Sequence, residues 1–253
     1  MTRWKAAGIH LAISAAVVGT LVVLLLLTWY PPAFVRMGKL GTLVALIGGI
    51  DLVVGPLLTL IVFKSGKPKL KLDLAIIGLL QVSAMAYGMH VLWQSRPVYL
   101  VAVQDRFELV YANEIDPADL ALGTAHGHGE LSKSGPVLVG TLQPLLASER
   151  SDLMLSAAAG RDIQTKPQYF VPYDQAASVL AANALPLSPG RGTSPHLSDA
   201  LTGKARALGK NPSELAWVPI TSTRGASAVM LIEQGTGAIV ETVDIEPWEN
   251  HDP

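Results

Sequence analysis

The chain has 253 residues, of which 50% are hydrophobic and 15% charged, a combination that is unusual for a soluble protein. Residues 1–96 carry nine Lys and Arg against two acidic residues, a net charge of +7, whereas residues 97–253 carry ten against eighteen, a net charge of −8. Neither part has the basic surface that nucleic-acid binding needs, and the lack of cysteine excludes disulfides, thiolate metal sites and cysteine nucleophiles.

Three apolar segments occupy the basic part, at about residues 6–29, 40–63 and 74–93. Each is long enough to cross a hydrocarbon core of about 30 Å as a helix. The first is longer than the apolar run of a secretory signal, and Trp29-Tyr30-Pro31-Pro32 follows it instead of a small-residue cleavage site. We therefore predict an uncleaved transmembrane domain of three helices over residues 1–95, embedded in the lipid bilayer.

Positive charges flanking the segments predict the orientation. Six Lys and Arg, at positions 3, 5, 64, 67, 69 and 71, lie on one side of the membrane, and Arg36, Lys39 and Arg96 lie on the other. The positive-inside rule then predicts a cytoplasmic N-terminus and a C-terminal part on the outer, periplasmic side of an inner-membrane-type protein.

Small residues recur at four-residue spacing in two of the segments, and such ridges let helices approach closely. Two interpretations remain open: the ridges pack the three helices on one another, or one of them docks a transmembrane helix of a partner. The ridges consist of Gly8, Ala12, Ala16 and Thr20 in the first segment and Gly41, Ala45 and Gly49 in the second.

Asp51 lies in the middle of the second segment, where a charge costs roughly 3 kcal/mol on membrane-insertion scales. An intramembrane carboxylate is therefore a functional candidate. It can form a buried hydrogen bond to a neighbour such as Gln81, contact a polar group of a partner helix, or handle protons or ions. Pro56 leaves the carbonyl of Leu52 without its helical hydrogen bond, which predicts a kink beside Asp51.

From Arg96 onward, short alternating runs predict strands at 98–103 and 107–111 joined by a turn at 104–106, which make a first hairpin, and a strand at 136–142. A second hairpin, of 228–232 with 238–243, is predicted around Gly235-Thr236-Gly237. A helix capped by Asp174 is expected to run to Asn183, and another from Ser194 to Gly209, followed by a capped turn at 211–214. The sequence thus predicts a small α+β domain with an antiparallel sheet over residues 96–253, whose strand order it does not reveal.

This second part contains little that indicates catalysis or cofactor binding. His126, His128 and Glu130 form a conceivable zinc set, but the glycines between them favour a solvated loop. Ser194, His196 and Asp199 are close in sequence without a nucleophile-elbow motif, and helix capping explains Ser194 better. We predict no enzymatic activity, no metal, no cofactor and no small-molecule substrate.

The chain resembles the TfpX/TfpZ family of type IV pilin accessory proteins over roughly its first 115 residues. The likeness is carried by Arg3-Trp4-Lys5-Ala6, by Trp29-Tyr30-Pro31-Pro32, most specifically by residues 49–60 around Asp51, and then by Leu80-Gln81, Tyr87-Gly88, Arg96-Pro97-Val98-Tyr99 and Asp105-Arg106-Phe107.

This resemblance implies a non-enzymatic inner-membrane factor that helps a particular pilin accumulate and enter pili, with the pilin or the pilus assembly machinery as partner. A membrane-anchored periplasmic sensor or scaffold unrelated to pili is the main alternative, and a membrane enzyme is a weaker one. The residues assigned to partner binding as a hypothesis are Asp51, Gly49, Gly55, Pro56, Gln81, Tyr87 and Arg96.

Overall fold

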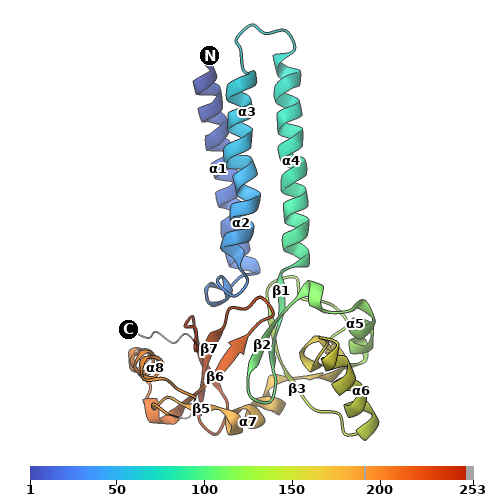
Figure 1. The fold of residues 1–253 in the computed structure, drawn as a ribbon, viewed down its shortest axis with the longest axis vertical. Coiled ribbons are helices and arrows are strands. Elements are labelled where there is room, and N and C mark those ends of the chain that lie inside the picture. Colours follow the sequence, from blue (N-terminus) through green and yellow to red (C-terminus); the bar gives the residue numbers. More distant parts are fainter. Residues whose placement is uncertain (191, 249–253) are drawn as a thin grey trace.

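The computed structural model describes residues 1–190 and 192–248, and it sets a bundle of long helices against one end of a sheet that carries shorter helices (Figure 1). All three long helices are apolar enough to span a membrane, so the three expected segments are confirmed, with ends shifted by at most four residues. They are α1 (Arg3–Thr28), a helix built of α2 (Leu40–Gly49), the π-helical turn η2 (Ile50–Val54) and α3 (Gly55–Val62), and α4 (Leu70–Gln94).

The distortion that was expected beside Asp51 is present as the π-helical turn η2. The N–H of Gly55 bonds to the carbonyl of Ile50, five residues back. In this pattern the carbonyl facing Pro56, which has no N–H, is that of Asp51 and not that of Leu52. The amide of Gln81 donates to the Asp51 carbonyl at 3.4 Å, so the orphaned acceptor has a partner on another helix.

The remaining described residues, from Pro97 onward, are here called the head, and they form one eight-stranded sheet. Its order is β4-β3-β1-β2-β6-β7-β8, with β5 paired to β6. The strands are β1 (Pro97–Ala102), β2 (Phe107–Tyr111), β3 (Val137–Thr141), β4 (Phe170–Val171), β5 (Leu185–Pro186), β6 (Leu215–Thr221), β7 (Ala228–Glu233) and β8 (Ile239–Val243).

The sheet is mixed, which corrects the expectation of an antiparallel one. Both predicted hairpins are present, as the antiparallel pairs β1–β2 and β7–β8. However, β1 pairs with β3 in parallel and β2 pairs with β6 in parallel. Both parallel pairs join strands that are distant in sequence, which local alternation cannot reveal.

Helices cover both faces of this sheet (Figure 1). They are α5 (Pro117–Gly123), α6 (Ala147–Ala158), α7 (Tyr173–Asn183) and α8 (Pro195–Ala207), with short 3₁₀ turns at Pro32–Phe34, Ala112–Glu114, Thr124–His126, Ile163–Thr165, Pro167–Tyr169 and Pro212–Glu214. Ser194 caps α8 as expected, accepting from the N–H of Leu197. The predicted cap at Asp174 is wrong, because α7 begins one residue earlier and Asp174 lies in its first turn.

The loop between α1 and α2 joins the bundle to the head. Its Phe34 and Met37 are buried in the same apolar cluster as Phe107 and Leu109 of β2. The hydroxyl of Tyr111 donates to the carbonyl of Met37 at 3.1 Å. Since residues before the second long helix complete the core of the head, the bundle and the head form one packed unit.

Candidate functional site

Four polar side chains from all three long helices meet inside the bundle. His10 of α1 lies between Thr59 of α3 and Gln81 of α4, with its Nδ1 2.6 Å from the Thr59 hydroxyl and its Nε2 2.6 Å from Gln81 Oε1. The amide nitrogen of Gln81 in turn donates to Asp51 Oδ1 at 3.2 Å. We call these four residues the polar cluster.

The hydrogen bonds of the polar cluster have a direction. Gln81 Oε1 can only accept, so His10 Nε2 carries a proton, and in a neutral imidazole Nδ1 then accepts from the Thr59 hydroxyl. Donation therefore runs from Thr59 through His10 and Gln81 to Asp51. The chain of donors ends at the carboxylate, which is where negative charge needs stabilisation.

Asp51 is 5% exposed, yet only one of its carboxylate oxygens is hydrogen-bonded. No described residue donates to Oδ2. This leaves part of the carboxylate available to a group from outside the chain.

A groove between α1 and α4 gives access to this carboxylate. α1 and α4 lie on either side of the α2–α3 helix (Figure 1), and the space between them has a volume of about 450 Å³. Its floor includes His10, Asp51 and Gln81, and its remaining lining consists of Ile13, Ser14, Val17, Gly78, Val82, Met85 and Ala86. A second space of about 340 Å³ shares His10, Ile13 and Gly78 with the first and extends the groove toward Met1 and Phe63.

The predicted residues Gly55 and Pro56 support the polar cluster from within. Both are buried at the start of α3. A Cβ on Gly55 would overlap the Gln81 amide, so only glycine leaves room for Gln81 to reach Asp51. The sequence hypothesis therefore named four residues that the fold brings together: Asp51, Gly55, Pro56 and Gln81.

Gly49 lies two residues before Asp51, about half a turn away, on a different face of the helix. A Cβ added there would have no neighbour within 4 Å, and the same holds for Gly8 and Gly41. Both small-residue ridges thus lie outside the contacts among the three helices, although one interpretation had assigned them to internal packing. The face of α1 that does pack carries Ala6, Ser14, Val18 and Leu25.

Tyr87 and Arg96 lie away from the polar cluster. Tyr87 is 72% exposed on α4 and does not line the groove. Arg96 is 3% exposed just beyond α4, with its guanidinium 3.6 Å from the ring centroid of Trp93 and donating to the Ser132 carbonyl at 3.0 Å. Burial lowers the pKa of Arg96, and its contacts tie the end of α4 to the head.

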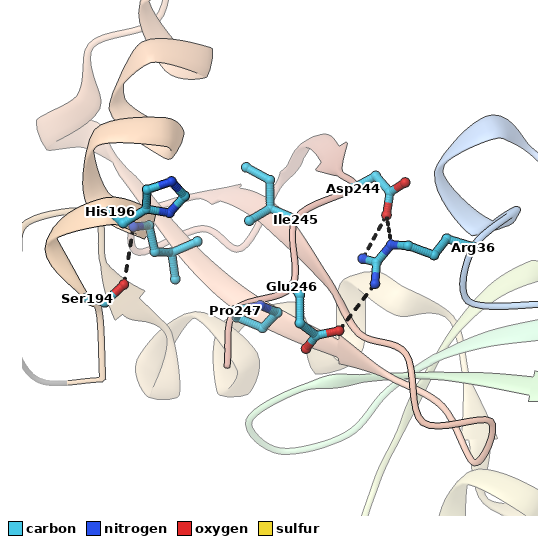
Figure 2. Close-up of a pocket in the computed structure, with 8 residues that line it drawn as sticks. Arg36, Ser194, His196, Asp244, Ile245, Glu246 and Pro247 are labelled. Carbon is cyan, nitrogen blue, oxygen red and sulfur yellow. Dashed lines mark hydrogen bonds and ion pairs between the residues drawn. The ribbon is translucent and has the colours of Figure 1, made fainter. Parts of the chain in front are cut away.

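A pocket of about 310 Å³ in the head lies between Arg36 and the start of α8 (Figure 2). The guanidinium of Arg36 is engaged by Asp244 at 2.8 Å and by Glu246 at 3.3 Å. The hydroxyl of Ser194 accepts from Leu197 at 3.2 Å. Because each group already serves a fold contact, this pocket is a weaker candidate site than the groove.

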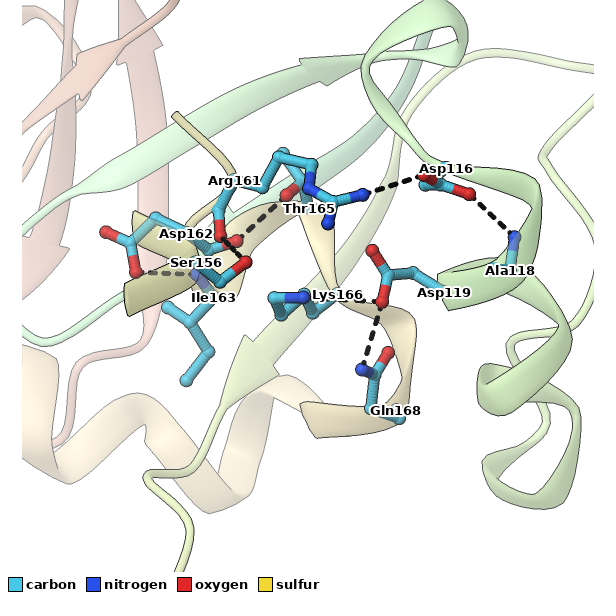
Figure 3. A network of polar contacts seen from close by, with 10 residues as sticks. All are labelled: Asp116, Ala118, Asp119, Ser156, Arg161, Asp162, Ile163, Thr165, Lys166 and Gln168. Carbon is cyan, nitrogen blue, oxygen red and sulfur yellow. Dashed lines mark hydrogen bonds and ion pairs between the residues drawn. The ribbon is translucent and has the colours of Figure 1, made fainter. Parts of the chain in front are cut away.

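A second polar group of the head holds α5 against the segment that follows α6 (Figure 3). Asp119 and Lys166 are each 8% exposed, with Lys166 Nζ 3.3 Å from Asp119 Oδ1, and the Gln168 amide donates to the same oxygen at 3.4 Å. At the surface, Arg161 pairs with Asp116 at 2.7 Å. These contacts join neighbouring elements of the head.

The His126 loop does not assemble into a metal site. His128 packs edge-on against Phe170, with ring centroids 5.6 Å apart, and burial lowers its pKa. Within residues 1–190 and 192–248, no group of three or more His, Asp or Glu is arranged to hold a metal ion.

His10 and Thr59 are the site residues that sequence reasoning missed. Both were visible as polar residues interrupting apolar segments. His10 also follows Ala6 and precedes Ser14 at four-residue spacing, which placed it on the packed face of α1. Only the packing of three helices brings His10 between Thr59 and Gln81.

Comparison with known proteins yields three relatives, all from Dichelobacter nodosus. The chain is 28% identical over 250 residues to the fimbrial assembly protein of serogroup I and 27% identical over 250 residues to that of serogroup E1, covering 97% of this chain and 96% of each relative. It is 35% identical over 114 residues to the fimbrial assembly protein of serogroups C1 and C2, which covers 44% of this chain and 86% of the relative. No protein-family model and no solved structure matches the chain.

Proposed function

The chain belongs to the family of fimbrial assembly proteins, and on this premise we propose that it is an inner-membrane accessory factor that binds a type IV pilin. Membership supports a role in the biogenesis of pili. The finer proposal is that the protein acts as a chaperone, promoting accumulation of its pilin or entry of the pilin into pili, as the TfpX/TfpZ resemblance implies. The relatives' names weigh against a sensor or scaffold unrelated to pili, and they describe assembly instead of catalysis.

The observation that carries the proposal is the polar cluster beside an open groove at membrane depth. A helix bundle that serves only as an anchor has no need of Asp51, which costs free energy in a bilayer. A waiting pilin has an apolar N-terminal helix and a globular part outside the membrane. A factor that handles it needs one surface within the membrane and another outside it, and this chain has a bundle and a head packed as one unit.

The orientation is part of the proposal. The positive-inside rule favours an N-terminus and an α3–α4 loop in the cytoplasm, with Lys at positions 64, 67 and 69 in the loop and at position 71 in the first turn of α4. The head then lies in the periplasm, on the side where the globular part of a pilin is found.

Deletion of the gene tests this function. We expect the major pilin to fall in abundance on immunoblots and surface pili to be lost, with both restored by the wild-type gene on a plasmid. Purification of the tagged full chain in mild detergent should yield the pilin by mass spectrometry. Normal piliation in the deletion strain, together with the absence of pilin from the purified material, would overturn the proposal.

A further inference from the structure

We propose that the groove between α1 and α4 binds one transmembrane helix of the pilin, and that this helix presents a hydrogen-bond donor to Asp51 at the middle of the membrane. The inference rests on the proposed function, because it names the surface and the chemistry by which the pilin is held. It assigns to the lipid-exposed side of the bundle a recognition role that anchoring does not require.

The shape of the groove fits a helix. Its two spaces adjoin, since both are lined by His10, Ile13 and Gly78. Along α1 the lining runs from Ala6 to Val17, which is about 17 Å at a rise of about 1.5 Å per residue. Three turns of a partner helix therefore fit beside α1 and α4. Gly78 leaves space on the α4 wall, because a Cβ there would have no neighbour within 4 Å.

The depth of the groove limits its occupant. Asp51 is the central residue of the 23-residue span Leu40–Val62. An occupant at that level is either the acyl chain of a lipid or a transmembrane helix of another protein.

The floor of the groove decides between these two. The Asp51 carboxylate has an oxygen that accepts no hydrogen bond from any described residue, and it faces a groove whose walls include Ile13, Val17 and Val82. An acyl chain has no donor and would leave this buried polar oxygen without a partner in hydrocarbon. A helix with a hydroxyl, amide or cationic donor at that level supplies the missing bond, so the unpaired oxygen and the apolar walls together select a helix.

Photo-crosslinking in cells tests the site directly. A benzophenone amino acid is placed at Val82, which lines the groove, or at Leu79, which does not; both are on α4 and both are 67% exposed. We expect an adduct with the major pilin from position 82 and little from position 79. Asp51→Leu should lower the position-82 adduct about tenfold, the loss expected for one hydrogen bond to a charged group.

A steric variant covers the case in which Asp51→Leu alters the bundle. Val82→Trp fills the groove and leaves the polar cluster intact, and Leu79→Trp is its matched control. We expect detergent co-purification of the pilin to be lost in Val82→Trp and retained in Leu79→Trp.

The outcomes separate the inference from the function on which it rests. If the wild-type chain co-purifies with pilin but position 82 yields only lipid adducts, or if Val82→Trp and Asp51→Leu bind pilin normally, the groove is not the site and the function stands. If the wild-type chain co-purifies with no pilin at all, the proposed function itself fails.

Discussion

The guanidinium of Arg224 lies 3.5 Å from the centroid of the Tyr111 ring, at the point where the head meets the bundle. From there it donates to the carbonyl of Gly38 at 2.8 Å and to that of Ser95 at 2.7 Å. One side chain thus joins the β6–β7 turn to the α1–α2 loop and to the end of α4. The head is held on the bundle by directed contacts and not only by the covalent chain.

Arg224→Ala should therefore loosen this junction. Hydrogen bonds to charged groups contribute about 1.5–3 kcal/mol each, so partial compensation by water leaves an expected loss of about 2–3 kcal/mol in the free energy of unfolding. Thermal unfolding in detergent measures the loss, and limited proteolysis between residues 30 and 40 should become faster. Arg150→Ala is the control, because Arg150 is exposed on α6; equal effects of the two substitutions would contradict the assignment.

Tyr111→Phe tests the contribution of the Tyr111 hydroxyl separately from that of its ring. The ring stays under Arg224, but the hydrogen bond to the Met37 carbonyl at 3.1 Å is lost. Leaving a buried acceptor unsatisfied costs about 1–3 kcal/mol, so the variant should unfold more easily at neutral pH.

The same variant should be less sensitive to alkali. Burial raises the pKa of Tyr111 from 10 to about 12, so the unfolded chain loses this proton first and the wild type is destabilised as the pH rises from 10 to 12. The stability difference between wild type and Tyr111→Phe should shrink across that interval. A difference that stays constant from pH 8 to pH 11.5 would show that the Tyr111 hydroxyl does not titrate as proposed.

Local pattern was sufficient to predict the elements whose pairing is local. The three apolar helices and both hairpins follow from runs of adjacent residues. β6 was not predicted, and Pro219 within it is a residue that argues against a central strand. In the structure Pro219 pairs only with Val229 of β7, since β5 reaches residue 217 and β2 begins to pair at residue 220, so its missing N–H interrupts no pairing on that side.

Part of the candidate site was also predictable from local sequence pattern. Asp51 is conspicuous because a carboxylate in an apolar segment is costly, and Gln81 was its nearest polar counterpart on the next helix. The groove was not predictable, because it depends on α1 and α4 packing against the middle helix and leaving space between themselves. That the small-residue ridges face outward was not predictable either, because it also depends on how the three helices pack.

His128 should make the head sensitive to acid. Burial against Phe170 lowers its pKa below 6.5, and the neighbouring His126 lowers it further. The unfolded chain therefore takes up a proton first, so this contribution to stability is present above about pH 6.5 and is lost as the pH falls through the lower folded value. His128→Phe should flatten the dependence of the unfolding temperature between pH 7.5 and 5, whereas His126→Gln, at an exposed position, should leave most of it.

Substitutions at Gly55 and Gly49, on either side of Asp51 in the sequence, test how the polar cluster is packed. Gly55 lies against the Gln81 amide, whereas Gly49 faces open space. A Cβ at Gly55 would overlap the Gln81 amide, so Gly55→Ala must displace Gln81 and break its bonds to Asp51 and His10. The displaced group is the end of a flexible side chain, so the cost is that of its lost hydrogen bonds, about 0.5–1.5 kcal/mol each, and a lower unfolding temperature in detergent should report it. Gly49→Ala adds the same methyl group six residues earlier, where no atom outside the helix's own nearby backbone lies within 4 Å, and should not lower the unfolding temperature. If the two alanine variants unfold at the same temperature, then Gln81 does not depend on the space at Gly55, and the polar cluster is not held as described.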